Sequence, residues 1–244
     1  MTWSIIARDS QTGQFGIAVA TKFFAVGARV PHIVAGIGGI ATQALVNPYY
    51  GIDGVKLLGQ GLAPNDILKT LLAGDDGRES RQLHIMDARG RIAAHTGRDC
   101  IDWCGHIQGD GFSIAGNMLA GAAVLDDTAK AYAANVGLPL SRRLIAAMHA
   151  GEAAGGDKRG KQSAALLIHG EEEWSELSLR VDDHADPLRE LARLEEVSRE
   201  RWVHFRQFMP TRKNPAGITD RATIDAGIEA SIEASIQAAA AGKT

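Results

Sequence analysis

The chain has 244 residues, 45% of them hydrophobic, which is enough to bury a substantial core. Its 26 basic and 29 acidic residues give a net charge of −3 without a basic stripe, so neither nucleic acid nor an anionic membrane is expected as a partner. No apolar run approaches the roughly 20 residues of a membrane-spanning helix, and no basic region followed by an apolar one opens the chain. These properties favour a cytoplasmic protein that acts on a small molecule with at most one charge.

The first predicted element is a β-hairpin with strands at residues 2–9 and 14–21. A turn centred on Thr12 places Thr2 opposite Lys22, to within one residue. The same register places Ser4 opposite Ala20 on the face that carries Thr2, so Ser4 is a candidate substrate-binding residue.

Thr2 is the first candidate for catalysis. Removal of Met1 is expected because the next residue is small, and it would leave Thr2 with a hydroxyl and a free α-amine, a nucleophile that carries its own general base. The ammonium of Lys22 would disfavour protonation of that amine and stabilise an oxyanion. Threonine at position 2 is also common in proteins without such chemistry, and Lys22 has an alternative role as a strand-end lysine that protects a sheet edge.

The middle of the chain alternates predicted strands and helix pairs. Strands are expected at 32–36, 38–46, 81–88, 91–95, 100–108, 112–118, 162–169 and 174–181. Helices are expected from Asn47-Pro48, from about Pro64, and over 121–135 and 139–150. Many of the strands are apolar on both faces, as expected when a sheet packs on another sheet and on helices. The order therefore predicts an α+β fold, a four-layer αββα sandwich.

Gln43 and Asn47 flank the junction between the strand at 38–46 and the first helix. Backbone amides at a helix start can hold a carboxylate, which makes both residues candidates for substrate binding.

The two cysteines belong to a short motif that raises the question of a metal. On a strand, Cys100, Cys104 and His106 would share one face, with His95 upstream. A C-x3-C pair without a second distant pair is more often two buried thiols, so no metal ligand is assigned. A zinc hydrolase that uses these four residues is kept as an alternative.

The C-terminal part is predicted to be helical. From Asp186 to Phe208 an apolar stripe indicates one long charged helix. After two prolines, isoleucines recur every fourth residue at Ile224, Ile228, Ile232 and Ile236. Residues 1–208 are therefore expected to form the sandwich and 209–244 a helical extension. The isoleucine stripe indicates packing against a neighbouring subunit or the chain's own body, with a fraying tail as the alternative.

Several motifs in this order resemble those of an uncharacterised bacterial family placed in the N-terminal nucleophile (Ntn) hydrolase superfamily. The resemblance covers about residues 1–200 and rests on Met1–Asp9, Ala18–Ala28, Ala41–Ala44, Arg91–Gly97, Gly116–Leu119, Gly155–Leu166 and Val181–His184. It implies the αββα fold and, by analogy with the superfamily, hydrolysis of an amide C–N bond without a cofactor. It does not imply a particular substrate.

The resemblance also implies two further site residues. In similar folds, the groups that hold the oxyanion and support the amine come from stretches that match Gly116–Met118 and Gly160–Ser163. Asn117 would donate its amide to the oxyanion, with a turn residue or helix cap as the alternative. Ser163 would bind the Thr2 amine, with a small packing residue as the alternative.

These observations predict an Ntn-type amidohydrolase in which Thr2 attacks, Lys22 and Asn117 stabilise charge, and the substrate is a small molecule or short peptide with an amide bond. A homo-oligomer is expected. The main rival is a non-catalytic binding protein that keeps the same fold.

Overall fold

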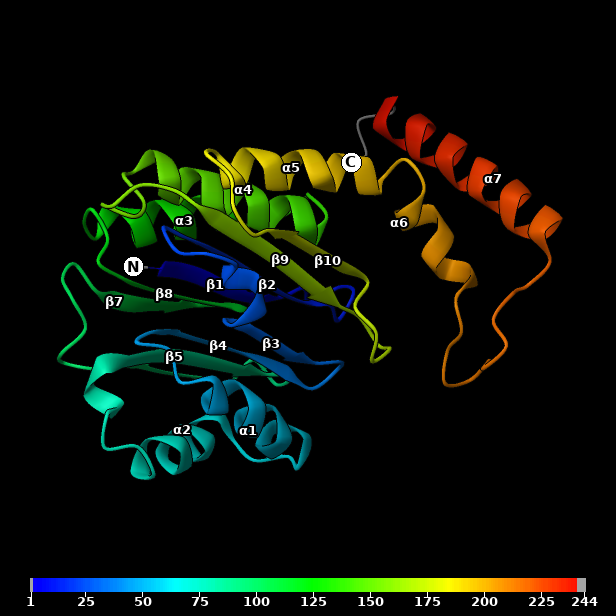
Figure 1. Ribbon diagram of the computed structural model, residues 1–244. Helices are drawn as coiled ribbons and strands as arrows, with labels where there is room; N and C mark the ends of the chain where they lie inside the picture. The colour runs from blue at the N-terminus through cyan, green and yellow to red at the C-terminus, as the bar shows by residue number, and fades with distance from the viewer. Residues whose placement is uncertain (1, 241–244) are drawn as a thin grey trace.

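The computed structural model describes residues 2–240, which form two antiparallel β-sheets and the helices that flank them (Figure 1). The larger sheet has the strand order β10-β9-β2-β1-β8-β7, and the smaller sheet has the order β3-β4-β5-β6. The strands are β1 (Thr2–Arg8), β2 (Phe15–Thr21), β3 (Pro31–Val34), β4 (Gly38–Ala44), β5 (Arg81–Asp87), β6 (Ile92–Thr96), β7 (Gly105–Gly109), β8 (Phe112–Asn117), β9 (Ser163–His169) and β10 (Leu177–Val181).

Helices lie on both outer sides of the two packed sheets (Figure 1). Helices α3, α4 and α5 cover the larger sheet, and α1 and α2 cover the smaller one. The helices are α1 (Pro48–Gly59), α2 (Pro64–Ala73), α3 (Ala123–Ala134), α4 (Leu140–Ala153), α5 (Pro187–Ser198), α6 (Trp202–Phe205) and α7 (Arg221–Ala240). The mixed α and β composition expected from the sequence is confirmed. Within the described residues, no helix is long and apolar enough to cross a membrane.

Strand β1 shows why the central strands are apolar on both faces. Ile5 packs among the side chains of the helix layer, and its neighbour Ile6 points the other way, into the layer between the sheets. A third cluster, which includes Ile40 and Leu58, joins the smaller sheet to α1 and α2. Thr2 and Ser4 lie on the same face of β1 as Ile6, so the inter-sheet layer is apolar around Ile6 and polar toward the start of the strand.

The register of the first hairpin differs from the predicted one by a residue. Thr2 pairs with Thr21, and Ser4 pairs with Val19. The cause is the turn: Asp9 and Gln14 are joined by a backbone hydrogen bond, and the four residues between them end at Gly13, which has a φ of 74°. Because this loop has an even number of residues, the centre of the hairpin lies between two residues rather than on Thr12.

Two predicted elements do not form as expected. The segment 98–104 is a loop, and β7 begins only at Gly105, so the alternation of side chains assumed for the cysteine motif does not exist. The long helix predicted to Phe208 ends at Ser198 and resumes as α6. The break brings Trp202 and Arg206 onto Glu176, with Trp202 Nε1 donating to the Glu176 carbonyl at 2.7 Å and Arg206 forming an ion pair with the carboxylate.

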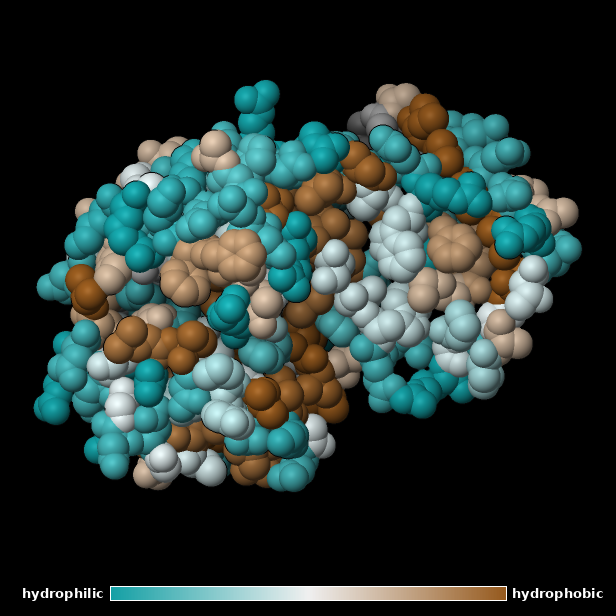
Figure 2. All heavy atoms as spheres, in the orientation of Figure 1, coloured by the Kyte–Doolittle hydropathy of each residue, from teal (hydrophilic) through white to brown (hydrophobic). Residues whose placement is uncertain are grey.

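The C-terminal helices form a lobe beside the main body (Figures 1 and 2). In Figure 2 hydrophilic residues cover most of this lobe, with apolar residues visible along α7. The isoleucine stripe is partly buried: Ile228 is 3% exposed, whereas Ile236 is 64% exposed. Gly227 faces the Phe208 ring, and His204 shares a 2.8 Å hydrogen bond with Ser231. Helix α7 thus packs on α6 and the turn that follows it.

Candidate functional site

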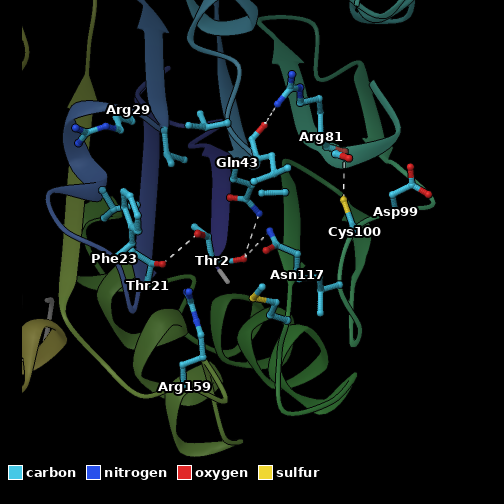
Figure 3. A pocket seen from close by; sticks show the side chains of 18 residues that line it. Thr2, Thr21, Phe23, Arg29, Gln43, Arg81, Asp99, Cys100, Asn117 and Arg159 are labelled. Atoms are coloured by element: carbon cyan, nitrogen blue, oxygen red, sulfur yellow. Dashed lines mark hydrogen bonds between the residues drawn. The ribbon is translucent and has the colours of Figure 1, made fainter. Parts of the chain in front are cut away.

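A cavity of about 570 Å³ opens at the polar end of the inter-sheet layer (Figure 3). Strand β1 starts there, and its neighbours β2 and β8 end there because antiparallel neighbours alternate in direction. Strand β4 of the smaller sheet also ends there. The lining residues are Thr2, Thr21, Phe23, Val26, Arg29, Val30, Gln43, Ala44, Leu45, Val46, Ser80, Arg81, Asp99, Cys100, Ile101, Asn117, Met118 and Arg159. Of the predicted site residues, the cavity brings together Thr2, Gln43 and Asn117.

Left-handed backbone conformations occur around this cavity. Among the described residues, Ala25, Ala44 and Met118 are the non-glycine residues with positive φ, at 54°, 70° and 54°. Ala44 and Met118 line the cavity, and Ala25 precedes the lining residue Val26. Such conformations cost energy and persist where the surrounding structure enforces them, which is common at functional sites. They turn the chain sharply at the ends of β4 and β8.

The Thr2 hydroxyl lies at the base of the cavity beside a second hydroxyl. Thr2 Oγ1 donates to Thr21 Oγ1 at 3.1 Å, and the two residues are 8% and 2% exposed. The one-residue shift in register produces this pair, because it places Thr21 rather than Lys22 opposite Thr2.

Two carboxamide side chains approach the backbone of Thr2, and a third, Gln82, accepts a hydrogen bond from each of them. Gln43 Nε2 and Asn117 Nδ2 both approach the Thr2 carbonyl at 3.4 Å. Gln43 Nε2 also donates to Gln82 Oε1 at 2.8 Å and to the Ala115 carbonyl at 3.0 Å. Asn117 Nδ2 donates to Gln82 Oε1 at 2.9 Å, so both of its N–H groups are directed at protein acceptors. Asn117 therefore positions Thr2 rather than offering a donor to an oxyanion.

Ser4 lies below this carboxamide group and outside the cavity, with no exposed surface. Ser4 Oγ donates to Gln43 Oε1 at 2.7 Å, and its only proton is then used, so His84 Nε2 donates to Ser4 Oγ at 2.9 Å. His84 Nδ1 accepts from Ser113 Oγ at 2.9 Å. Burial, and then the charge of His106, lower the pKa of His84 to about 3, so the ring is neutral at pH 7.

Arg159 is the cation that points toward the two threonines (Figure 3). Asp157, 7% exposed, holds it with one carboxylate: Oδ1 accepts from the Arg159 amide at 2.8 Å, and Oδ2 accepts from Nη2 at 3.1 Å. Oδ2 also accepts from the Lys22 amide at 2.7 Å, which ties the end of β2 to the same group. The guanidinium is thus fixed beside Thr2 by a buried counter-ion.

Lys22 lies outside the cavity. Its exposed side chain donates from Nζ to the Lys161 carbonyl at 3.0 Å. The position follows from the corrected register, because Lys22 comes one residue after the end of β2 and its side chain turns away from the inter-sheet layer.

Asn47 and Ser163 also lie outside the cavity lining and have local roles. Asn47 is the N-cap of α1: its Oδ1 accepts from the Tyr49 amide, and its Nδ2 donates to Asp75 at 3.0 Å. Ser163 Oγ donates to the Phe23 carbonyl at 2.5 Å and accepts from the Val26 amide at 3.2 Å. Ser163 therefore fixes the loop that carries Phe23 and Val26 into the cavity.

The residues of the zinc alternative do not converge. His95 Nε2 lies 2.9 Å from the Arg78 carbonyl and His106 Nδ1 3.0 Å from Thr96 Oγ1. Within residues 2–240 no group of three or more His, Cys, Asp or Glu side chains is placed to hold a metal ion. Cys100 lines the cavity, but burial and then Cys104 raise the pKa of its thiol to about 11, which keeps the sulfur protonated at pH 7.

Four residues of the site were not predicted from the sequence: Thr21, Gln82, Arg159 and Asp157. Thr21 follows from the correct hairpin register, for which Gly13 at the end of a four-residue loop was the available signal. Asp157 and Arg159 lie in the glycine-rich stretch Gly155–Gly160, whose composition indicates a turn but gives no sign of the cavity.

Comparisons with known proteins identify a family. A model described as a family of unknown function, DUF1028, matches residues 2–191. The chain is similar to a crystal structure of a DUF1028 protein from Silicibacter pomeroyi, with 32% identity and a TM-score of 0.84 over 90% of this chain and 96% of that one. Anbu, an ancestral beta-subunit from Yersinia bercovieri, is 12% identical with a TM-score of 0.42 over 80% and 95% of the two chains. A search of curated proteins found no match. The chain belongs to the DUF1028 family.

Proposed function

We propose that this protein is an amidohydrolase of the Ntn type, an αββα sandwich that cleaves an amide C–N bond with Thr2 as its nucleophile. The observation that carries the proposal is the Thr2 hydroxyl at the base of a cavity large enough for a small organic ligand. The Thr21 hydroxyl lies 3.1 Å from it, and Arg159 points toward both.

The proposed reaction has two stages. Thr2 Oγ attacks the amide carbon and its proton passes through water to the Thr2 α-amine, which then delivers it to the departing amine as the C–N bond breaks. Water attacks the resulting ester, the α-amine takes and returns the proton, and the acid product leaves. Arg159, in the place expected for Lys22, stabilises the negative charge on the carbonyl oxygen. The α-amine is free only after removal of Met1, which lies outside the described residues.

The test is Thr2→Ala in a screen of amides, lactams and short peptides, with intact mass to establish the loss of about 131 Da for Met1. Hydrolysis should fall by several orders of magnitude, because the covalent route is lost, and the melting temperature should stay within a few degrees. Thr2→Ser should keep partial activity. Thr70→Ala, an exposed threonine on α2, is the matched control and should behave like the wild type. Full activity in Thr2→Ala, or retention of Met1 in active protein, would favour the rival role as a binding protein.

A further inference from the structure

Large apolar side chains surround the cavity mouth. Phe23, Leu45 and Ile101 are 58%, 66% and 55% exposed, and each lines the cavity. They come from three separate segments: the loop after β2, the end of β4 and the loop before β7. Isolated exposed hydrophobic residues are ordinary, but a group that encloses one cavity marks a surface that a ligand covers. Two further apolar side chains, Val30 and Met118, line the deeper wall of the cavity.

Most charges that line the cavity are neutralised by the protein itself. Arg81 Nε is 3.0 Å from Asp75, and Arg159 Nη2 is 3.1 Å from Asp157. Asp99 is 61% exposed and has Arg98 at 3.9 Å. Each of these three lining residues therefore has a side chain of opposite charge beside it.

Arg29 differs from the other two cavity arginines. Among residues 2–240, no carboxylate lies within 4.0 Å of its guanidinium, and Nη1 makes a 3.3 Å contact with the Ala25 carbonyl. Arg29 follows the 3-10 turn Val26–Ala28 and lies on the same side of the cavity as Phe23 (Figure 3). Arg29 is exposed, and its guanidinium can pair with a carboxylate that a ligand brings to the edge of the cavity.

We infer that the substrate of the Thr2 site is an N-acylated amino acid or a close analogue: an amide with an apolar acyl chain and a carboxylate on the amine side. The inference rests on the proposed function, since it places the scissile amide at Thr2. The acyl chain packs against Phe23, Leu45 and Ile101, and the carboxylate pairs with Arg29 at the edge of the cavity. A volume of about 570 Å³ is in the range of sites that enclose ligands of this size.

The test measures binding without turnover, by titration calorimetry on the full-length Thr2→Ala variant. Three probes separate the two features: N-octanoylglycine has both the chain and the carboxylate, N-ethyloctanamide lacks the carboxylate, and N-acetylglycine lacks the long chain. N-octanoylglycine should bind at least tenfold more tightly than N-ethyloctanamide, as expected for a charge-assisted hydrogen bond. It should bind at least a hundredfold more tightly than N-acetylglycine, because six methylenes become buried.

Two substitutions in the same background locate the features. Arg29→Gln should weaken N-octanoylglycine at least tenfold and leave N-ethyloctanamide unchanged, whereas Leu45→Ser should weaken both octanoyl probes. The controls are Arg89→Gln, an exposed arginine in the turn between β5 and β6, and Val136→Ser, which is 69% exposed outside the cavity. Neither control should change binding.

The outcomes distinguish this inference from the proposed function. The inference is overturned if N-octanoylglycine does not bind, or if N-ethyloctanamide or N-acetylglycine binds equally well. It is also overturned if the Arg29→Gln variant binds N-octanoylglycine as tightly as the Arg89→Gln control. Binding as expected without hydrolysis by the wild type would contradict the hydrolase proposal and leave the ligand class standing. If the wild type hydrolyses other amides but the protein does not bind these probes, the hydrolase proposal stands and the inferred ligand class is wrong.

Discussion

The hydroxyls of Thr2 and Thr21 form a pair in which Thr2 is the donor, at 3.1 Å. This contact fixes the rotamer of the side chain that we propose as the nucleophile. Thr21→Val keeps the shape and the β-branching of the strand residue but removes the acceptor. Turnover should fall by roughly ten- to a hundredfold, the effect expected for a lost hydrogen bond of about 1–3 kcal/mol, with a smaller change in KM.

The control for Thr21→Val is Thr42→Val, a second buried strand threonine, whose hydroxyl donates to the Asn47 carbonyl at 3.3 Å away from the cavity lining. It should leave kcat unchanged. Equal losses of kcat in the two variants would mean that Thr21 affects packing rather than the nucleophile.

Arg159 points toward the same pair of hydroxyls. Arg159→Gln should lower kcat by one to two orders of magnitude and change KM less, because the charge acts mainly on the oxyanion. Asp157→Asn should reduce kcat in the same direction, since the carboxylate that aims the guanidinium is lost. Arg89→Gln is the matched surface control. A loss confined to KM in Arg159→Gln would instead assign this residue to substrate binding.

The candidate site was only partly predictable from the sequence. Gln43 and Asn117 reach the cavity because they end strands that meet at one edge, which a pattern of strands and helices can indicate. Whether Thr21 or Lys22 lies opposite Thr2 depends on whether the turn contains an even or an odd number of residues. A change of one residue in the turn moves every side chain of β2 to the opposite face. Arg159 enters from a loop, whose path no periodicity specifies.

A polar seam joins the two sheets beneath the cavity. Its side chains come from strands of both sheets and are almost fully buried: Ser4, Gln43, Gln82, His84, Ser113 and Asn117. Each donor and acceptor described above has a partner, so the seam replaces apolar packing without unpaired groups. It orients the larger sheet against the smaller one next to Thr2.

The seam makes stability depend on pH through His84. Its pKa is lowered to about 3 in the folded protein, whereas the unfolded value is near 6.5. The unfolded state therefore binds more protons between these values, and the free energy of unfolding should fall with decreasing pH, by up to about 1.4 kcal/mol per pH unit from this residue. Denaturant unfolding at pH 7.5, 5.5 and 4.5 measures the slope. His84→Gln should flatten it between pH 6.5 and 4.5, and an unchanged slope would contradict the burial of a neutral ring.

Most element boundaries were predictable from local signals. Asn47-Pro48 specifies the start of α1 through the cap and the fixed φ of proline, and alternating or continuous apolar runs define the strands. The failures occurred where tertiary contacts decide: the loop at 98–104 and the break after Ser198, which Glu176 enforces from a distant hairpin.

The C-terminal lobe is the part of the protein that we expect to mediate assembly. Truncation after Pro210 removes α7, which packs on α6 rather than on the sheets. The remaining fold should keep its melting temperature within a few degrees, and light scattering should show a smaller oligomer. Ile236→Ser should weaken assembly in the same way, with Val136→Ser as the exposed control. Unchanged assembly in the truncated chain would contradict an oligomer formed through α7.

The cysteine motif is expected not to hold a metal ion. Cys100 Sγ donates to the Arg81 carbonyl at 3.3 Å, and Cys104 Sγ donates to the Cys100 carbonyl at 3.4 Å, so both thiols are engaged away from the two histidines. Purified protein should contain well under one zinc per chain, and chelators should leave thermal stability unchanged. Stoichiometric zinc with unfolding on chelation would support the zinc-hydrolase alternative.

The polar seam also has a direction. Each residue of the seam donates a hydrogen bond to the next in the order Ser113, His84, Ser4, Gln43, Gln82 and Thr96. This sense cannot reverse, because Gln43 Nε2 also faces the Ala115 carbonyl, which can only accept. Gln43 therefore presents an N–H group, never its oxygen, to the Thr2 carbonyl at the start of β1. This carbonyl is already ordered in the folded protein, before a ligand binds. Binding of a ligand in the cavity therefore requires no ordering of this backbone, and none of the binding free energy is lost to such ordering.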